Sequence, residues 1–193
     1  SLSAYAGTLR TRAESAWNWA VANPNVTFRN NDSSNGSEGL GAGQQETDDR
    51  GRFTARLIAA VYLYDLTGKA VYRDYVENNY AQANLIRWNN YVSPYEGGMQ
   101  LALLHYASLP GAAASTATAI RNAYGNGMES EWFWGKVTGK TDPYMAFIPD
   151  YIWGSNSVKS VEGSLFLDLR RFGIGRRSEG EGVCAAAGDV HYL

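Results

Sequence analysis

The chain has 193 residues, enough for one domain with a sizeable core, and its 17 lysines and arginines nearly balance its 19 aspartates and glutamates. No basic stripe follows any predicted element, no run of eighteen apolar residues occurs, and the first residues lack the pattern of a signal peptide. Neither a nucleic acid nor a membrane is therefore expected as a partner. Aromatic residues make up 13% of the chain, which suits a large core or a groove that stacks flat apolar faces.

The chain begins with two predicted helices separated by a long polar loop. Apolar residues recur every three or four positions over residues 3–22, which predicts an amphipathic helix that ends before Pro24. Residues 25–45 are rich in Asn, Ser, Gly and Glu and predict a loop. The next helix is predicted to begin at Asp48 and to end at Gly68, because acidic residues stabilise a helix start and glycine adopts the left-handed conformation of a C-cap.

Further helices follow from the same spacing. They are predicted from residue 69 toward residue 88, and over 94–107, 115–124 and 157–169, with a weaker one over 181–193. Residues 125–156 show no regular period and hold seven large aromatic side chains, so they are predicted to form a long aromatic loop. No alternating segment predicts a strand. Helices joined by short turns and long loops favour stacked antiparallel helical hairpins, and the predicted fold is an all-α toroid.

Three segments share their order and spacing with a known enzyme family. They are "AESAWNWAVANPN" (13–25), "GQQETDDRGRFTARLIAAVYLYDLTGKAVYRDYV" (43–76) and "TGKTDPYMAFIPDYIWGSNSVKSVEGSLFLDL" (138–169). Together they resemble the catalytic domain of glycoside hydrolase family 9, the cellulase family built as a barrel of six helical hairpins. The first resembles a helix with tryptophans before an Asn-Pro stop, the second an acidic turn before an Ala-Ala-x-x-Leu-Tyr-x-x-Thr-Gly helix, and the third a Tyr-x-Trp-Gly-Ser-Asn segment.

The resemblance implies part of an (α/α)6 toroid, so residues 1–193 are expected to be one incomplete catalytic domain, the middle to C-terminal part of the barrel with both ends missing. It implies inverting hydrolysis of β-1,4-glucan, a cellulose-type polysaccharide, by a secreted endoglucanase-like parent enzyme. The family's base belongs to an Asp-Ala-Gly-Asp motif and its acid is a glutamate near the end of the domain, and neither has a counterpart here. No catalytic residue is assigned, and this segment alone is expected to be inactive.

The segment "DYIWGSNSVKS", residues 150–160, sets two aromatic residues and four small polar residues at the start of a predicted helix. The faces of a glucose ring carry C–H groups and its rim carries hydroxyls, so this composition is typical of a sugar groove. The resemblance implies that Trp153 faces bound glucan, and Tyr151 and Asn156 are the other candidate substrate-binding residues. Trp153 could instead fill the joint between loop and helix, and Asp150 is interpreted as a cap or turn residue rather than a catalyst.

The acidic turn "ETDD" offers Glu46, Asp48 and Asp49 beside a glycine-bearing loop. Carboxylates and backbone carbonyls together suit a hard cation such as calcium. The resemblance implies a calcium at a corresponding turn, although the family's usual pair there is Asp-Glu. The alternative is that these acids only cap the helix that follows. A structural calcium is the one cofactor hypothesis, and no organic cofactor is expected.

Other interpretations remain open at this stage. The toroid is shared by polysaccharide lyases and other six-hairpin glycosidases, and a non-catalytic carbohydrate-binding scaffold would keep the same aromatic loop. Trp88 is predicted to pack in the core, and Trp132 and Trp134 either line a distant subsite or fill a loop. Cys184, the single cysteine, is interpreted as structural. The sequence carries no signal for the oligomeric state.

Overall fold

The structure is a computed structural model that describes residues 2–26, 33–35, 47–139 and 155–175. Every regular element in these ranges is helical: α1 (Leu2–Ala22), η1 (Ser33–Asn35), α2 (Asp49–Thr67), α3 (Ala70–Asn79), η2 (Tyr80–Gln82), α4 (Asn84–Arg87), η3 (Pro94–Glu96), α5 (Gly97–Tyr106), α6 (Ala114–Met128), α7 (Trp134–Gly139) and α8 (Ser155–Arg171). The prediction of an all-α chain is confirmed. No helix in the described ranges has the length and apolar character needed to cross a bilayer.

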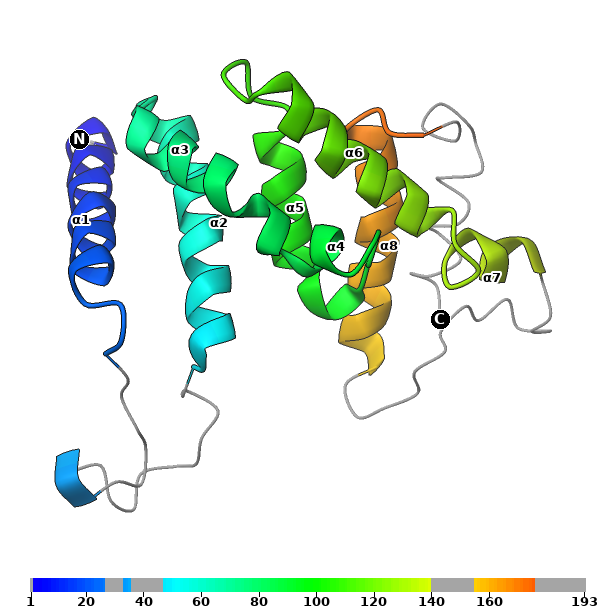
Figure 1. Cartoon of the computed structure of the whole chain (residues 1–193), viewed down its shortest axis with the longest axis horizontal. Coiled ribbons are helices and arrows are strands. Elements are labelled where there is room, and N and C mark those ends of the chain that lie inside the picture. Colours follow the sequence, from blue (N-terminus) through cyan, green and yellow to red (C-terminus); the bar gives the residue numbers. More distant parts are fainter. Residues whose placement is uncertain (1, 27–32, 36–46, 140–154, 176–193) are drawn as a thin grey trace.

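The helices form a row in which α1 and α2 run in opposite directions, while α2, α5 and α8 run in the same direction (Figure 1). Helix α1 runs against α2, and α2 packs on both α3 and α5. Helix α5 also contacts α6 and α8, so it lies in the middle of the packed part of the chain. Helices α2 and α8 begin at the same edge, the lower one in Figure 1, and the short turn η3 contacts α8. Loops at this edge can therefore form a common surface.

Helix α2 begins and ends as its sequence predicts. The carboxylate of Asp48 accepts a hydrogen bond from the Gly51 backbone N–H at 2.7 Å, which satisfies one of the free amides of the first turn. At the other end Gly68 has a φ of 66°, and its N–H donates to the carbonyl of Tyr64 at 2.7 Å. A residue with a β-carbon is strained at such a φ, so glycine stabilises this C-cap.

Two predictions about element boundaries need correction. The single helix predicted from residue 69 toward residue 88 is broken into α3, η2 and α4. At this break the side chain of Asn84 is buried between two partners. It accepts a hydrogen bond from Arg50 at 2.7 Å and donates one to Glu96. The predicted aromatic loop also contains the end of α6 and all of α7. There, Phe133 and Trp134 are buried against α8, and this tertiary packing holds a helical turn that has no periodic signal.

A half-buried carboxylate on α3 joins three helices. Glu77 accepts hydrogen bonds from the hydroxyls of Tyr106 on α5 and Thr116 on α6, and from the backbone N–H of Ala113 at 3.0 Å. Burial acts to raise the pKa of Glu77, but these three donors outweigh it and leave that pKa below its usual value. Burial and the neighbouring Glu77 charge raise the pKa of the Tyr106 hydroxyl, which stays a donor. The ionised Glu77 therefore stabilises the packing of α3, α5 and α6.

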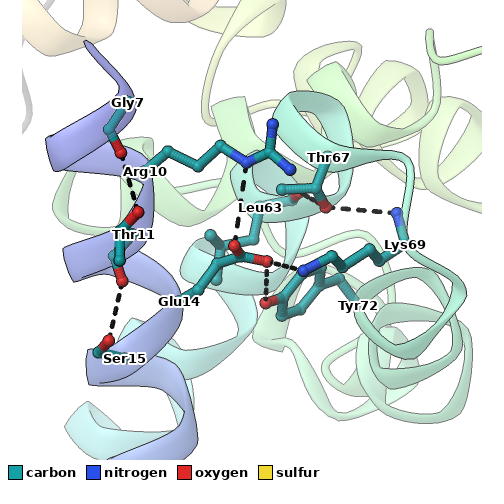
Figure 2. A network of polar contacts seen from close by, with 9 residues as sticks. All are labelled: Gly7, Arg10, Thr11, Glu14, Ser15, Leu63, Thr67, Lys69 and Tyr72. Atoms are coloured by element: carbon teal, nitrogen blue, oxygen red, sulfur yellow. Dashed lines mark hydrogen bonds and ion pairs between the residues drawn. The ribbon is translucent and has the colours of Figure 1, made fainter. Parts of the chain in front are cut away.

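Helix α1 contacts the others through few side chains (Figure 2). Glu14 forms an ion pair with Lys69 in the turn between α2 and α3 and accepts a hydrogen bond from the Tyr72 hydroxyl at 3.2 Å. The hydrogen bond from Lys69 is the main cause that lowers the pKa of Glu14. Trp17 is the only buried side chain of α1 within the described range, and it meets Tyr72 and Tyr75 edge-on at centroid distances of 5.2 Å and 5.1 Å. The rest of α1 is largely exposed.

A buried carboxylate on α8, Asp168, has an environment opposite in kind to that of the half-buried Glu77. Asp168 is 9% exposed, and burial raises its pKa to about 6, although the charge of Arg171 one turn later opposes that change. The nearby Tyr124 hydroxyl donates to the carbonyl of Leu165 at 2.8 Å rather than to this carboxylate. Ionised Asp168 is therefore a source of instability in the core at neutral pH.

Candidate functional site

An aromatic cleft of about 530 Å³ lies between the segment that joins α4 to η3 and the turn before α7. Exposed aromatic side chains from both segments line it: Trp88, Tyr91, Tyr95 and Trp132. Short polar side chains lie between them: Asn89, Asn90, Ser93, Asn126 and Ser130. Exposed aromatics gathered around one cleft are unusual, since isolated ones are common on any protein surface but contiguous ones mark binding sites.

The first wall is a corner made by two aromatic rings. Trp88 and Tyr91 meet edge-to-face, with ring centroids 5.1 Å apart and an angle of 77° between their planes. Their side chains are 53% and 39% exposed, so both present ring surface to solvent. The prediction that Trp88 packs in the core is therefore wrong. Its place after an apolar stripe is misleading, because α4 ends at Arg87 and the indole projects from the cap beyond it.

The backbone that carries this corner is a tight helix ending. The N–H of Asn90 donates to the carbonyl of Leu85, and that of Asn89 donates to the carbonyl of Ile86, each at 3.0 Å. This is the paired hydrogen bonding of a Schellman motif, with Asn89 at the left-handed position that glycine usually takes. Asn89 has a φ of 51° and Asn90 a φ of 67°. Two successive left-handed residues with side chains are uncommon, and asparagine tolerates this conformation better than most residues.

The second wall is held in place by two buried aromatic residues. Phe133 and Trp134 are 5% and 4% exposed and pack edge-on against Phe166 of α8, with centroid distances of 6.1 Å and 5.1 Å. Their neighbour Trp132 is 67% exposed, and the ammonium of Lys136 lies 5.9 Å from the centre of its ring. The sequence left open whether these tryptophans line a subsite or fill a loop. Trp134 fills the core, and Trp132 lines the cleft.

The third side of the cleft is fixed by polar contacts around η3. The Ser93 hydroxyl accepts a hydrogen bond from the Tyr95 N–H at 3.2 Å, and the Ser93 carbonyl accepts one from the buried Gln100 side chain at 3.0 Å. These bonds orient the loop that carries the exposed Tyr95 ring. Glu162 of α8, 3% exposed, is the one carboxylate among the described residues that line the cleft. A stacking surface edged by amides, hydroxyls and one carboxylate can bind a polyhydroxylated ring by its faces and its rim.

The residues predicted from sequence for sugar binding lie only partly within the described ranges. Tyr151 and Trp153 fall outside them, as does Asp150. Asn156 lies in the first turn of α8 and is exposed, on the same helix as Glu162 of the cleft. The interpretation of Asn156 as a substrate-binding residue stays a prediction.

The acidic residues predicted to bind calcium also lie only partly within the described ranges. Glu46 lies outside the described residues, Asp48 caps α2, and Asp49 forms an ion pair with Arg52. Within the described ranges no group of three or more His, Cys, Asp or Glu side chains is placed to hold a metal ion. The capping alternative for Asp48 is observed, and the calcium hypothesis stays a prediction.

The cleft residues that the sequence interpretation missed carried a weak signal. The stretch "WNNY", residues 88–91, combines two asparagines, which favour turns, with an aromatic residue on each side. Aromatics that flank a turn cannot both continue a buried helical stripe, so such a pattern predicts exposure. The single helix predicted through residue 88 hid this signal.

Comparison with known proteins gives one match. No curated protein and no solved structure matches the chain. The family described as Glycosyl hydrolase family 9 matches residues 1–174, which include both walls of the cleft and every described helix. This family has the (α/α)6 toroid as its fold, in agreement with the all-α architecture. The chain therefore belongs to glycosyl hydrolase family 9.

Proposed function

We propose that the chain is part of a secreted enzyme that hydrolyses β-1,4-glucan with inversion at the anomeric carbon, and that its aromatic cleft binds the polysaccharide. The observation that carries the proposal is the gathering of Trp88, Tyr91, Tyr95 and Trp132 around one cleft edged by amide and hydroxyl groups. Family membership supports the reaction class, glycoside hydrolysis. The cleft supports a substrate with flat apolar faces and a polar rim.

The chemistry of a β-1,4-linked glucose chain matches this lining. All ring substituents are equatorial, so both faces of each ring expose C–H groups that pack on an indole or phenol ring. The hydroxyls lie around the rim, where Asn89, Asn126 and Ser130 offer donors and acceptors. A volume of about 530 Å³ is within the range of small-molecule sites and accommodates a short stretch of chain.

Inverting hydrolysis requires an acid to protonate the leaving oxygen and a base to activate water, with the two carboxyl groups about 6.5 to 9.5 Å apart. We assign neither role to Glu162, because it is a single buried carboxylate in a stacking cleft. The catalytic pair is proposed to come from other parts of the parent enzyme. Trp153, Tyr151 and Asn156 are proposed as further substrate-binding residues.

The reaction is tested with the parent enzyme and cellohexaose. Proton NMR during the first minutes should show α-anomeric reducing ends, since inversion of a β-linkage yields the α-product. Trp153→Ala should lower kcat/KM for cello-oligosaccharides by an amount that corresponds to about 1 to 3 kcal/mol, the range for stacking on an aromatic side chain. Unsaturated products would indicate a lyase, β-anomers would contradict inversion, and binding without any cleavage would favour a non-catalytic scaffold.

A further inference from the structure

Three N-glycosylation sequons fall within thirteen residues of the chain, in the segment between α1 and α2. A sequon is Asn-x-Ser or Asn-x-Thr in which x is not proline. The triplets are Asn25-Val26-Thr27, Asn31-Asp32-Ser33 and Asn35-Gly36-Ser37. No other asparagine of the chain begins such a triplet. The clustering indicates one segment, rather than the whole surface, as the place for this modification.

Asn25 is the sequon asparagine whose side chain the structure describes. The chain leaves α1 in a turn, in which the Val26 N–H donates a hydrogen bond to the Asn23 carbonyl at 3.4 Å. Asn25 lies in this turn and is exposed, while Thr27 and Asn31 lie outside the described residues. A glycan needs an acceptor amide at the surface, where an enzyme reaches it and the bulky product fits. The turn after α1 meets this requirement.

An apolar groove of about 570 Å³ lies between α1 and α2 and reaches this turn. The two residues that flank Asn25 in the chain, Pro24 and Val26, line it. Trp19 and Leu66 also line it and are 58% and 55% exposed. A contiguous apolar surface of this kind favours self-association of a protein. A glycan is bulky and hydrated, so one attached at the turn can cover the adjoining end of the groove.

The same position leaves the aromatic cleft open. Helix α1 lies at one end of the row of helices, whereas α6 and α7 lie toward the other end (Figure 1). The cleft is lined by the segment between α4 and η3, by α6 and α8, and by the turn before α7. A glycan on the turn after α1 therefore lies away from the cleft, and modification and glucan binding are compatible.

We propose that Asn25 is the acceptor of an N-linked oligosaccharide that covers the α1–α2 groove at the end of α1. The proposal rests on the secretion included in the proposed function, because this modification is made as a chain enters the secretory pathway of a eukaryotic cell. The donor is an oligosaccharide joined to a lipid diphosphate. The Asn25 amide nitrogen forms a bond to the anomeric carbon of the first sugar and loses one proton. The bond from that carbon to the phosphate oxygen breaks, and the lipid diphosphate leaves.

The proposal is tested by expressing the 193-residue chain in yeast behind a secretion leader. Asn31→Gln and Asn35→Gln are introduced so that Asn25 is the one sequon asparagine left. Glycans are released enzymatically in heavy-oxygen water, and peptide mass spectrometry of medium and cell extract gives the occupancy even where export fails. About one half or more of the chains should carry a glycan on Asn25. Thr27→Ala keeps the asparagine but removes the sequon hydroxyl, so it should abolish the modification.

A matched control is Asn18→Gln, at an exposed asparagine of α1 outside any sequon, which should leave the occupancy unchanged. Removing the glycan from the secreted chain should raise the fluorescence of anilinonaphthalene sulfonate at least about 2-fold, because the groove is uncovered. An unmodified Asn25 in the cell extract would overturn the acceptor assignment, and an unchanged dye signal would overturn the covering of the groove. Cellohexaose hydrolysis is a separate measurement: a glycosylated chain whose parent enzyme cleaves no glucan would contradict only the proposed function.

Discussion

Gly127 of α6 touches the backbone of Asn90 so closely that a β-carbon at position 127 would lie 2.3 Å from the Asn90 carbonyl oxygen. Adjacent helices usually meet through side chains, and here a helix meets a left-handed turn through bare backbone. The contact joins α6 to the segment that carries Trp88 and Tyr91, so the fold and the candidate site share this residue.

Gly127→Ala should therefore destabilise the protein by about 1 to 3 kcal/mol, the usual cost of forcing an added methyl into a packed site. Urea unfolding followed by circular dichroism at 222 nm measures it. Gly98→Ala is the matched control, because no atom lies within 4 Å of a β-carbon there and alanine favours the helix by about 0.5 to 1 kcal/mol. Equal effects of the two changes would show that the close contact is absent.

Trp17 should make the main apolar contribution to holding α1 against the rest of the chain, beside the polar contacts of Glu14 with Lys69 and Tyr72. Trp17→Ala removes the edge-on contacts with Tyr72 and Tyr75, and large-to-small changes of this kind cost about 3 to 5 kcal/mol. Since little else of α1 is buried, the loss should appear as local opening of this helix. Hydrogen exchange of the α1 amides should accelerate at least about 100-fold while α5 stays protected. Trp19→Ala, at a position 58% exposed, should leave both unchanged.

Glu77 should make the protein sensitive to acid. Its folded-state pKa is lowered, so the unfolded chain binds the proton more tightly, and the stabilisation present above about pH 4.5 is lost as pH falls through the folded pKa. Glu77→Gln should remove that part of the pH dependence and cost about 1 to 3 kcal/mol at pH 7. Asp74→Asn, at an exposed carboxylate paired with Arg73 on the same helix, should cost less than about 0.5 kcal/mol. An unchanged acid limb in Glu77→Gln would contradict the assignment.

Asp168 should have the opposite effect. Its pKa is raised from 3.8 to about 6, so the folded state binds the proton more tightly and stability falls as pH rises from about 4 to 6. Asp168→Asn should stabilise the protein at pH 7 by about 1 to 3 kcal/mol, and the gain should disappear below pH 4. Denaturant melts at pH 3.5 and pH 7 measure the difference. A loss of stability at pH 7 would mean that the ionised carboxylate is favourably paired.

The helices of this fold were predictable where local chemistry determines them. Asp48 and Gly68 mark the ends of α2 because a short acidic side chain and an αL glycine satisfy free backbone groups without help from other elements. The break between α3 and α4 was not predictable, since it depends on Arg50 and Glu96 reaching Asn84 from distant positions. Spacing along one segment holds no information about such partners.

The candidate site, like the helices, was predictable only in part. The family resemblance predicted an aromatic sugar surface, and the family is confirmed. Which tryptophans face the cleft depends on where each helix ends and which neighbour it meets. Trp132 and Trp134 are two residues apart, yet the packing of Phe166 buries one and leaves the other exposed. Composition alone gives both the same interpretation.

The central claim is that this cleft binds glucan. It is tested by calorimetric titration of cellohexaose into the unsubstituted chain and into Trp88→Ala. Trp88→Ala should weaken binding about 5- to 100-fold, equal to about 1 to 3 kcal/mol of lost stacking, with no change in melting temperature. Trp134→Ala, at the buried position, should instead lower the melting temperature. An unchanged dissociation constant together with a lowered melting temperature in Trp88→Ala would contradict the account.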